Sequence, residues 1–184
     1  ERDSVETIAD GIATRTVGER TFEVIRERVD TVVTVSDSEI AVALTTLLER
    51  SKTLVEGAGA VALDAVIEGR FDYADDEVIV PALCGGNIDL NTLTNVIVRG
   101  LIETGRYLRI KTVLKDHPGA LEELVAVLSA QEVNIYAIEH DRTNRDVAMN
   151  DAEVELDLET RGPDHVDDLL AALRDHGYPV EVLV

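Results

Sequence analysis

Lysine, cysteine and aromatic residues are scarce in this chain of 184 residues. Its only lysines are Lys52, Lys111 and Lys115, its only cysteine is Cys84, and aromatic residues make up 3% of it. A single cysteine excludes an internal disulfide and is typical of a reducing compartment, so we expect a cytoplasmic protein. No apolar run approaches the roughly 20 residues that cross a bilayer, so we expect no membrane span.

Charge is strongly one-sided. The chain has 37 acidic residues against 17 basic ones, a formal net charge of -20, and is 45% hydrophobic. Such a surface repels nucleic acid and anionic membranes, so neither is an expected partner. Because the acids are spread beside regular apolar periodicity, disorder is disfavoured. The shortage of lysine and aromatics further indicates a protein from a high-salt organism, with an ordinary acidic protein as the alternative.

Residues 1–105 alternate helical and strand-like patterns. A capping box of Ser36 and Glu39 opens one of the helices, and Gly105 ends the last. Two short runs rich in β-branched residues predict buried strands. The expected helices are 18–29, 36–51, 56–69 and 89–105, and the expected strands are 31–35 and 77–83. This alternation predicts an α/β layer structure.

Residues 106–184 follow a different rhythm. "DAEVELDLET" (151–160) alternates apolar and acidic residues, which predicts a strand with one dry and one wet face. Pro118 is expected near the first position of a helix. Strands are expected at 107–114, 133–141, 151–160 and 178–184, with helices at 116–131 and 161–177. The order βαββαβ predicts a ferredoxin-like domain.

Four short motifs carry a family resemblance. They are "TIADGIA" (7–13), "TVVTVSDSEI" (31–40), "VEGAGAVAL" (55–63) and "CGGNID" (84–89). Their order and spacing resemble the threonine ammonia-lyases, or threonine dehydratases, enzymes of the tryptophan synthase β-like fold type II that use pyridoxal phosphate. "DHPGALEEL" and "VNI" in the tail resemble an ACT domain, a small amino-acid-sensing module often fused to these enzymes.

This resemblance has direct consequences for domains and activity. It implies that 1–105 is the C-terminal part of the catalytic domain and that 106–184 is an ACT regulatory domain. The enzymes of the family release water and ammonia from threonine or serine and give a 2-oxo acid, 2-oxobutanoate in the case of threonine. A serine racemase or serine dehydratase of the same cofactor fold is a further possibility.

The resemblance also implies cofactor roles for Cys84, Gly85, Gly11 and Glu56. Cys84 stands where the family has serine or cysteine beside the pyridine nitrogen. A thiol, with an unperturbed pKa near 8.5, is too weak an acid to protonate that ring, which favours β-elimination over transamination. Gly85 and Gly11 would let the backbone approach the cofactor, and Glu56 would lie by its pocket. The residues alone leave other roles open: a small buried hydrophobe for Cys84, a turn for Gly11, and a helix N-terminal acid for Glu56.

The catalytic lysine of the family has no counterpart here. In the family this Schiff-base lysine lies in an N-terminal motif of serine, glycine, asparagine and histidine type, and neither that motif nor the glycine-rich phosphate loop occurs in the chain. Lys52 falls in a predicted helix, and Lys111 and Lys115 fall in the ACT-like tail. With Glu1 rather than methionine at its start, we expect the chain to be a fragment that is inactive alone.

ACT domains bind effectors between two copies of the module. Here the resemblance assigns this role to Asp116, Pro118, Gly119, Ala120, Leu121, Asn134 and Ile135. A helix N-terminus suits a ligand carboxylate, and an asparagine offers both donor and acceptor. Isoleucine or valine is the implied effector, in allosteric control of isoleucine biosynthesis by a homo-oligomer. The alternative is a plain helix start at "DHPG", with Asn134 closing a turn.

Two readings of the whole chain therefore stand. The first is a piece of an allosteric ammonia-lyase, and the second is a non-catalytic module for amino-acid binding or assembly. No metal site is expected, because His117, His140, His165 and His176 follow no metal-ligand spacing.

Overall fold

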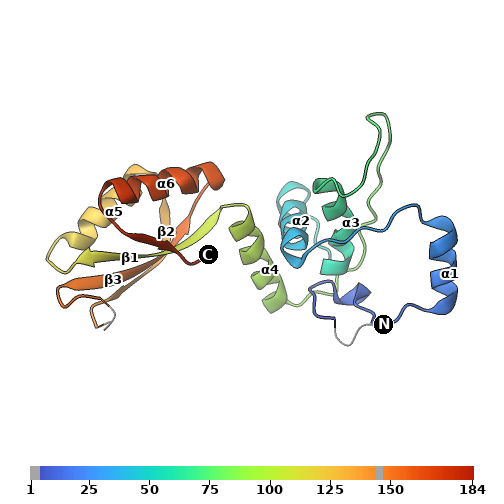
Figure 1. Ribbon diagram of the computed structural model, residues 1–184, viewed down its shortest axis with the longest axis horizontal. Helices are drawn as coiled ribbons and strands as arrows, with labels where there is room; N and C mark the ends of the chain where they lie inside the picture. The colour runs from blue at the N-terminus through green and yellow to red at the C-terminus, as the bar shows by residue number, and fades with distance from the viewer. Residues whose placement is uncertain (1–4, 144–146) are drawn as a thin grey trace. The chain divides into compact units, whose positions relative to one another are not determined.

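A computed structural model describes residues 5–143 and 147–184 (Figure 1). The protein is mixed α/β and folds as two compact units, Glu1–Gly100 and Leu101–Val184. The division lies within the helix Leu90–Glu103, a few residues before the boundary expected at 105. In the part of the chain that is described, no helix is long and apolar enough to cross a membrane.

The first unit contains helices only, as far as it is described. They are η1 (Asp10–Ile12, a 3-10 turn), α1 (Glu19–Arg28), α2 (Asp37–Arg50), α3 (Gly57–Ile67) and α4 (Leu90–Glu103). The predicted capping box begins α2: Ser36 Oγ accepts from the Glu39 N–H at 3.3 Å, and Glu39 accepts from the Ser36 N–H at 2.6 Å. Helices α2 and α3 pack together around a small apolar core that includes Leu44 and Ala60.

The two strands expected in this unit do not form. Residues 31–35 and 77–83 run without strand structure, although their β-branched composition predicted strands. A strand requires hydrogen bonds to a neighbouring strand, and no β-ladder occurs in the described part of this unit. Val32, Val78 and Val80 are accordingly 78%, 88% and 82% exposed rather than buried. Helix α1 forms as predicted, but none of its residues is buried.

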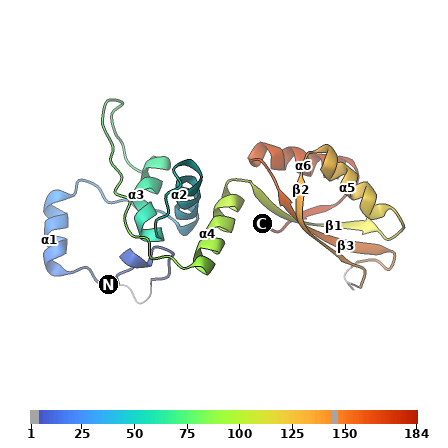
Figure 2. The ribbon, with the colours of Figure 1, turned by 180° about the vertical axis from the view of Figure 1, so that it is seen from behind.

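The second unit is a four-stranded antiparallel sheet with two helices on one face (Figure 2). Its elements are β1 (Tyr107–Lys115), α5 (Ala120–Ala130), β2 (Asn134–Asp141), β3 (Asp151–Glu159), α6 (Pro163–Asp175) and β4 (Val180–Val182). The strands lie in the order β2-β3-β1-β4, so β2 and β4 are the edges. The βαββαβ order matches the prediction. Helix α5, however, begins two residues after Pro118, because Gly119 adopts a left-handed conformation (φ +93°) as its N-cap.

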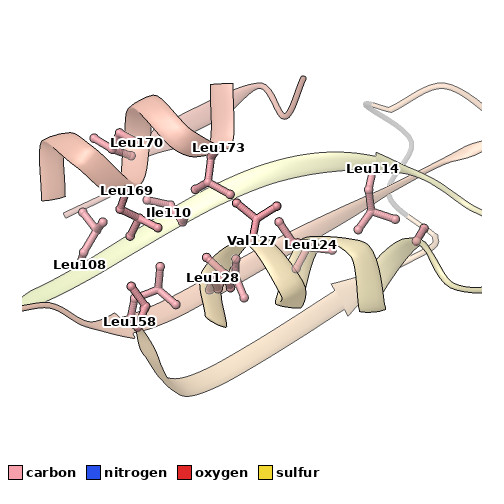
Figure 3. Close-up of a cluster of buried hydrophobic side chains, with 14 of the residues drawn as sticks. Leu108, Ile110, Leu114, Leu124, Val127, Leu128, Leu158, Leu169, Leu170 and Leu173 are labelled. Atoms are coloured by element: carbon pink, nitrogen blue, oxygen red, sulfur yellow. The ribbon is translucent and has the colours of Figure 1, made fainter. Parts of the chain in front are cut away.

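Alternate residues of β1 and β3 build the core of this unit, which Figure 3 shows against α5 and α6. In β3, Ala152, Val154, Leu156 and Leu158 are fully buried, as the alternation predicted. Leu124 and Leu128 of α5 and Leu169 and Leu173 of α6 complete the packing. Full burial of each such side chain contributes roughly 1.5–3 kcal/mol to the free energy of folding, so this unit has a hydrophobic core of its own.

The outer face of the same sheet is charged. Arg109 pairs with Asp157, Lys115 lies 2.6 Å from Asp151, and Lys111 lies 3.4 Å from Glu153. Two acidic pairs also stand directly opposite one another on β2 and β3, Glu139 with Glu155 and Asp141 with Glu153. Like charges in such positions destabilise a sheet.

Candidate functional site

Three segments that are far apart in the sequence meet at the first turn of α3. Glu56, its N-cap, donates its backbone N–H to the Gly85 carbonyl at 3.3 Å. Its side chain turns to the same loop, where Oε2 accepts from the Asn87 N–H at 3.0 Å. Glu56 therefore holds the loop after Cys84 at two points, one from its backbone and one from its carboxylate.

The small residues of "EGAGA" allow this close approach. A Cβ on Gly57 would lie within 3.0 Å of the Ile8 carbonyl, and a Cβ on Gly59 would lie within 3.0 Å of the Cys84 carbonyl. Both distances are closer than real Cβ contacts, so a side chain at either position would push a neighbouring segment away. The glycines of this motif are there for packing: they let residues 8 and 84 rest on the backbone of α3.

Gly11 and Gly85 face the same carboxylate. A Cβ on Gly11 would lie 3.0 Å from Oε1 of Glu56, and a Cβ on Gly85 would collide with the Glu56 side chain. Gly85 also has a φ of +75°, which a residue with a side chain rarely adopts. The structure thus brings together all four residues expected at the cofactor, Cys84, Gly85, Gly11 and Glu56.

Cys84 is an exposed free thiol. The expectation that it ends a buried strand is wrong, because 77–83 has no strand neighbour to bury it. The alternative role of a small buried hydrophobe is excluded by the same exposure. A hollow of about 670 Å³ lies beside α3. It is lined by residues 79–82 and, from the other extended segment, by Thr31 and Val33.

Each of the three lysines already contacts an oxygen of another residue. Lys52 follows α2 with a φ of +57° and donates its Nζ to the Glu49 carbonyl at 2.8 Å. Lys111 and Lys115 belong to the second unit, where they pair with Glu153 and Asp151. The arrangement supplies a thiol, a carboxylate and a close backbone, but no amine directed to a reacting group.

Asp64 is a feature that the sequence reasoning missed. It lies on α3, is 1% exposed, and neither of its oxygens has a hydrogen-bond partner among the described residues. Burial, and next the nearby Glu68, raise the pKa of this carboxyl to about 6. The signal was present in the sequence as a single acid within the apolar run "AVALDAVI".

The residues expected at the effector site divide into two groups. Asp116 and the loop up to Gly119 follow β1, Ala120 is buried, and Leu121 packs partly against the core. A Cβ on Gly119 would meet nothing within 4 Å, so open space lies beside the start of α5. A separate hollow of about 350 Å³ opens nearby, lined by residues that include His117, Glu123 and Tyr178.

Asn134 and Ile135 lie at the other end of the sheet. Asn134 pairs with Glu159, which pairs in turn with Tyr107 at the start of β1. Asp116 follows the end of β1, nine residues beyond Tyr107, so the two groups are separated by about 30 Å at ~3.3 Å per residue. The Asn134 amide donates to Glu159 Oε2 at 3.0 Å and does not close a turn. A single copy of this unit therefore does not bring the two groups together.

Three of the four histidines of the tail, His117, His165 and His176, contact backbone carbonyls. Nε2 of His165 lies 2.8 Å from the Gln131 carbonyl, and Nδ1 of His176 lies 2.8 Å from the Ala172 carbonyl. Within residues 5–143 and 147–184, no group of three or more His, Cys, Asp or Glu side chains is placed to hold a metal ion.

Comparison with known proteins places this geometry in context. The family model of pyridoxal-phosphate dependent enzymes matches residues 1–85. The L-threonine ammonia-lyase of Geobacter sulfurreducens is 46% identical over 178 residues, which is 96% of this chain and 44% of the relative. That of Thermotoga maritima is 38% identical over 177 residues, again 96% and 44%. A solved crystal structure of a threonine deaminase from T.th. is 40% identical, with a TM-score of 0.39 over 46% of this chain and 30% of that one.

The chain spans less than half the length of these two curated relatives. Their similarity extends over both units, whereas the family model ends within the loop that Glu56 holds. The chain is therefore similar to L-threonine ammonia-lyases over most of its length and matches the family model of pyridoxal-phosphate dependent enzymes over residues 1–85, which implies pyridoxal phosphate as the cofactor.

Proposed function

We propose that this chain is the C-terminal portion of a pyridoxal-phosphate-dependent threonine ammonia-lyase, which also accepts serine and gives 2-oxobutanoate and ammonia from threonine. Residues 1–105 are the last part of its catalytic domain, and 106–184 are an ACT regulatory domain. The observation that carries the proposal is the convergence of Gly11, Glu56 and the Cys84 loop at the first turn of α3.

The residues present fit one side of the cofactor. When bound, pyridoxal phosphate supplies an electron sink for bond breaking at the substrate's α-carbon. Cys84 is an exposed thiol, a weak hydrogen-bonding group that would face the ring nitrogen. Gly85 and Gly11 keep the backbone free of side chains at that point. Glu56 is a positioning residue, because its two hydrogen bonds hold the loop that bears the thiol.

The 184-residue chain alone is inactive under this proposal. Its sequence lacks the lysine motif and the phosphate loop, and its three lysines are engaged elsewhere. The exposed valines of 31–35 and 77–83, together with the hollow of about 670 Å³ that these segments line, support a missing lobe that packs there. That lobe would supply both the lysine and the phosphate loop.

Assay of 2-oxobutanoate formation tests this proposal. With threonine and pyridoxal phosphate, the 184-residue chain forms no 2-oxobutanoate, whereas the protein expressed from the complete reading frame does. In the complete protein, Cys84→Asp lowers kcat at least tenfold because a carboxylate would stabilise the protonated form of the ring nitrogen, while Cys84→Ser retains activity. Glu23→Gln, on the exposed helix α1, is the matched control. Product from the chain alone, or full activity in Cys84→Asp, contradicts the proposal.

The second part of the proposal is that residues 106–184 act as an amino-acid sensor. The βαββαβ order and the open space beside Gly119 support an effector site for isoleucine or valine. Because Asn134 lies far from Asp116 within one copy, the full site requires two copies, and we expect at least a dimer. Calorimetry with isoleucine, valine, threonine and serine at high salt tests the sensor. Heat that is lost in Asn134→Ala supports it, and silence from all four leaves assembly as the function of this unit.

A non-catalytic module for amino-acid binding or assembly is the second candidate function. The lack of a lysine at the Cys84 loop favours it. The two candidates are separated by the complete reading frame: a lysine motif and phosphate loop upstream of residue 1 support the enzyme, and a reading frame without them supports the module.

A further inference from the structure

Asp116 and Arg142 form an ion pair where two loops of the second unit meet. Nε of Arg142 donates to Oδ2 of Asp116 at 2.8 Å, and Nη2 lies 2.7 Å from the same oxygen. Asp116 directly follows β1 and Arg142 directly follows β2. The register of the sheet places the C-terminal ends of β1 and β2 at the same end of the sheet, where β3 begins opposite Lys115.

Both partners are held by their own backbone. The Asp116 N–H donates to the Asn150 carbonyl at 2.8 Å, which ties the β1–α5 loop to the start of β3. Beside Arg142, the Thr143 N–H and hydroxyl both donate to Asp141 Oδ1, at 2.7 and 2.8 Å. Such a turn fixes the direction in which Arg142 leaves the strand. The pair is therefore a local feature of the fold and involves no other unit.

The pair leaves binding capacity on both sides. Two of the three guanidinium nitrogens, Nε and Nη2, converge on Oδ2 of Asp116, and Oδ1 has no partner among the described residues. The Arg142 side chain is 65% exposed, and that of Asp116 is 24% exposed. An exposed ion pair contributes little to stability, so a ligand that offers charges of its own can replace it at little cost.

The loop that follows Asp116 has open space at its end. The loop that Asp116 begins continues to Gly119, where a Cβ would meet nothing within 4 Å. No side chain caps the start of α5. The Ala120 N–H donates to the His117 carbonyl at 3.2 Å, whereas the N–H groups of Leu121 and Glu122 have no acceptor among the described residues. A ligand at this end of the sheet would meet the carboxylate of Asp116, the guanidinium of Arg142 and, further along the same loop, the free N–H groups at the start of α5.

We propose that Asp116 and Arg142 together recognise the two charges of a free α-amino acid. Asp116 binds the ammonium group, and Arg142 binds the carboxylate through its planar fork of donors. The ligand takes the place of the ion pair, so binding separates the β1–α5 loop from the residues that follow β2. This inference rests on the effector role proposed above and adds Arg142 to it. It also predicts that organic acids without an ammonium group are rejected, because Asp116 repels them.

Calorimetry of the complete 184-residue chain with L-isoleucine and L-valine tests the pair. Arg142→Gln is expected to weaken binding at least tenfold, and Arg142→Lys is expected to weaken it less, because lysine keeps the charge but loses the fork. Arg174→Gln is the matched control, since Arg174 is an exposed arginine in the last turn of α6. L-valinamide, which has no carboxylate, and N-acetyl-L-valine, which has no ammonium, are expected not to bind.

A charge swap separates recognition from a structural role. The double variant Asp116→Arg with Arg142→Asp can restore the ion pair, so its thermal unfolding should match the original chain, but it should not recover binding. Unchanged affinity in Arg142→Gln, or binding of N-acetyl-L-valine as tight as that of valine, overturns the inference while the effector role stands. Absence of heat from both amino acids in the original chain overturns the effector role and this inference with it.

Discussion

The carboxylate of Glu56 accepts a hydrogen bond from the backbone N–H of Asn87, 31 residues further along the chain, at 3.0 Å. This contact joins the start of α3 to the loop that bears the only thiol of the protein. The position of Cys84 therefore depends on α3 and on the glycines of its first turn, so a change that destabilises this helix also displaces the thiol. The predictions below follow from this dependence and from the charges of the second unit.

Hydrogen exchange measures the Glu56–Asn87 contact directly. In Glu56→Ala the Asn87 N–H loses its acceptor, and the loop is held only through the Gly85 carbonyl. Since a net hydrogen bond contributes about 1 kcal/mol, more to a charged acceptor, exchange of the Asn87 amide should accelerate about tenfold. Glu23→Ala on exposed α1 should leave this rate unchanged. An unaltered rate in Glu56→Ala would show that the carboxylate does not hold the loop.

Alanine substitution separates the glycines that pack from those that do not. Gly59→Ala places a Cβ against the Cys84 carbonyl and should destabilise the first unit by about 1–3 kcal/mol, as overpacking does. Gly86→Ala, where a Cβ meets nothing within 4 Å, should remain within about 0.5 kcal/mol of the original chain. Urea unfolding followed by far-UV circular dichroism measures both. Equal stability of the two variants would remove the packing role assigned to Gly59.

The buried Asp64 makes the first unit less stable as pH rises. Its folded-state pKa, raised to about 6 by burial and Glu68, exceeds its ordinary value of 3.8. The protonated form is therefore favoured in the folded state, and its contribution is present at low pH and lost as pH rises through 6. A shift of about two pKa units corresponds to about 3 kcal/mol, of which about 1.4 kcal/mol falls between pH 5 and pH 8.

Asp64→Ala removes this dependence. Relative to the original chain, the variant should gain about 1.4 kcal/mol in unfolding free energy between pH 5 and pH 8. Asp72→Asn, an exposed acid in the same unit, serves as the control and should show no such change. Parallel pH profiles for Asp64→Ala and the original chain would mean that the carboxyl finds a partner or water in solution.

The acidic outer face should make the second unit dependent on salt. Glu139 stands directly opposite Glu155 on neighbouring strands, in a chain of net charge -20. Glu139→Lys converts this repulsion into attraction and should raise the unfolding free energy by about 0.5 kcal/mol at low salt. In 1 M KCl, where the screening length is about 3 Å, the gain should largely disappear. Thermal unfolding at low salt and in 1 M KCl measures it.

A control of equal charge change tests whether position matters. Asp168→Lys, on the exposed side of α6, alters the net charge by the same amount without relieving a directly opposed pair. It should stabilise the chain less than Glu139→Lys does. Equal gains from the two variants would assign the effect to net charge alone, and no gain from either would show that the acidic face is already screened by bound ions.

Several features could be predicted from sequence because they are local. The capping box of Ser36 and Glu39, the left-handed Gly105 after α4, and the alternation along β3 each depend on residues within a few positions of one another. The order βαββαβ followed from the same short-range patterns. The motifs also named four residues, Gly11, Glu56, Cys84 and Gly85, that the structure brings together at the first turn of α3.

Other features were decided only by contacts between distant segments. Residues 31–35 and 77–83 have the composition of strands, but a strand needs a neighbour, and no partner for them exists in the described part of their unit. The same lack of a neighbour leaves Cys84 exposed. Asp64 became notable only because tertiary packing leaves it 1% exposed. The pairing of Asp116 with Arg142 depends on sheet register, which places two strand ends at one edge although 26 positions separate these residues. Sequence determined the helices and the βαββαβ order, since these depend on local patterns. Tertiary structure decided whether a strand-like segment finds a neighbour and which charges are buried, paired or free, since both depend on contacts between distant segments.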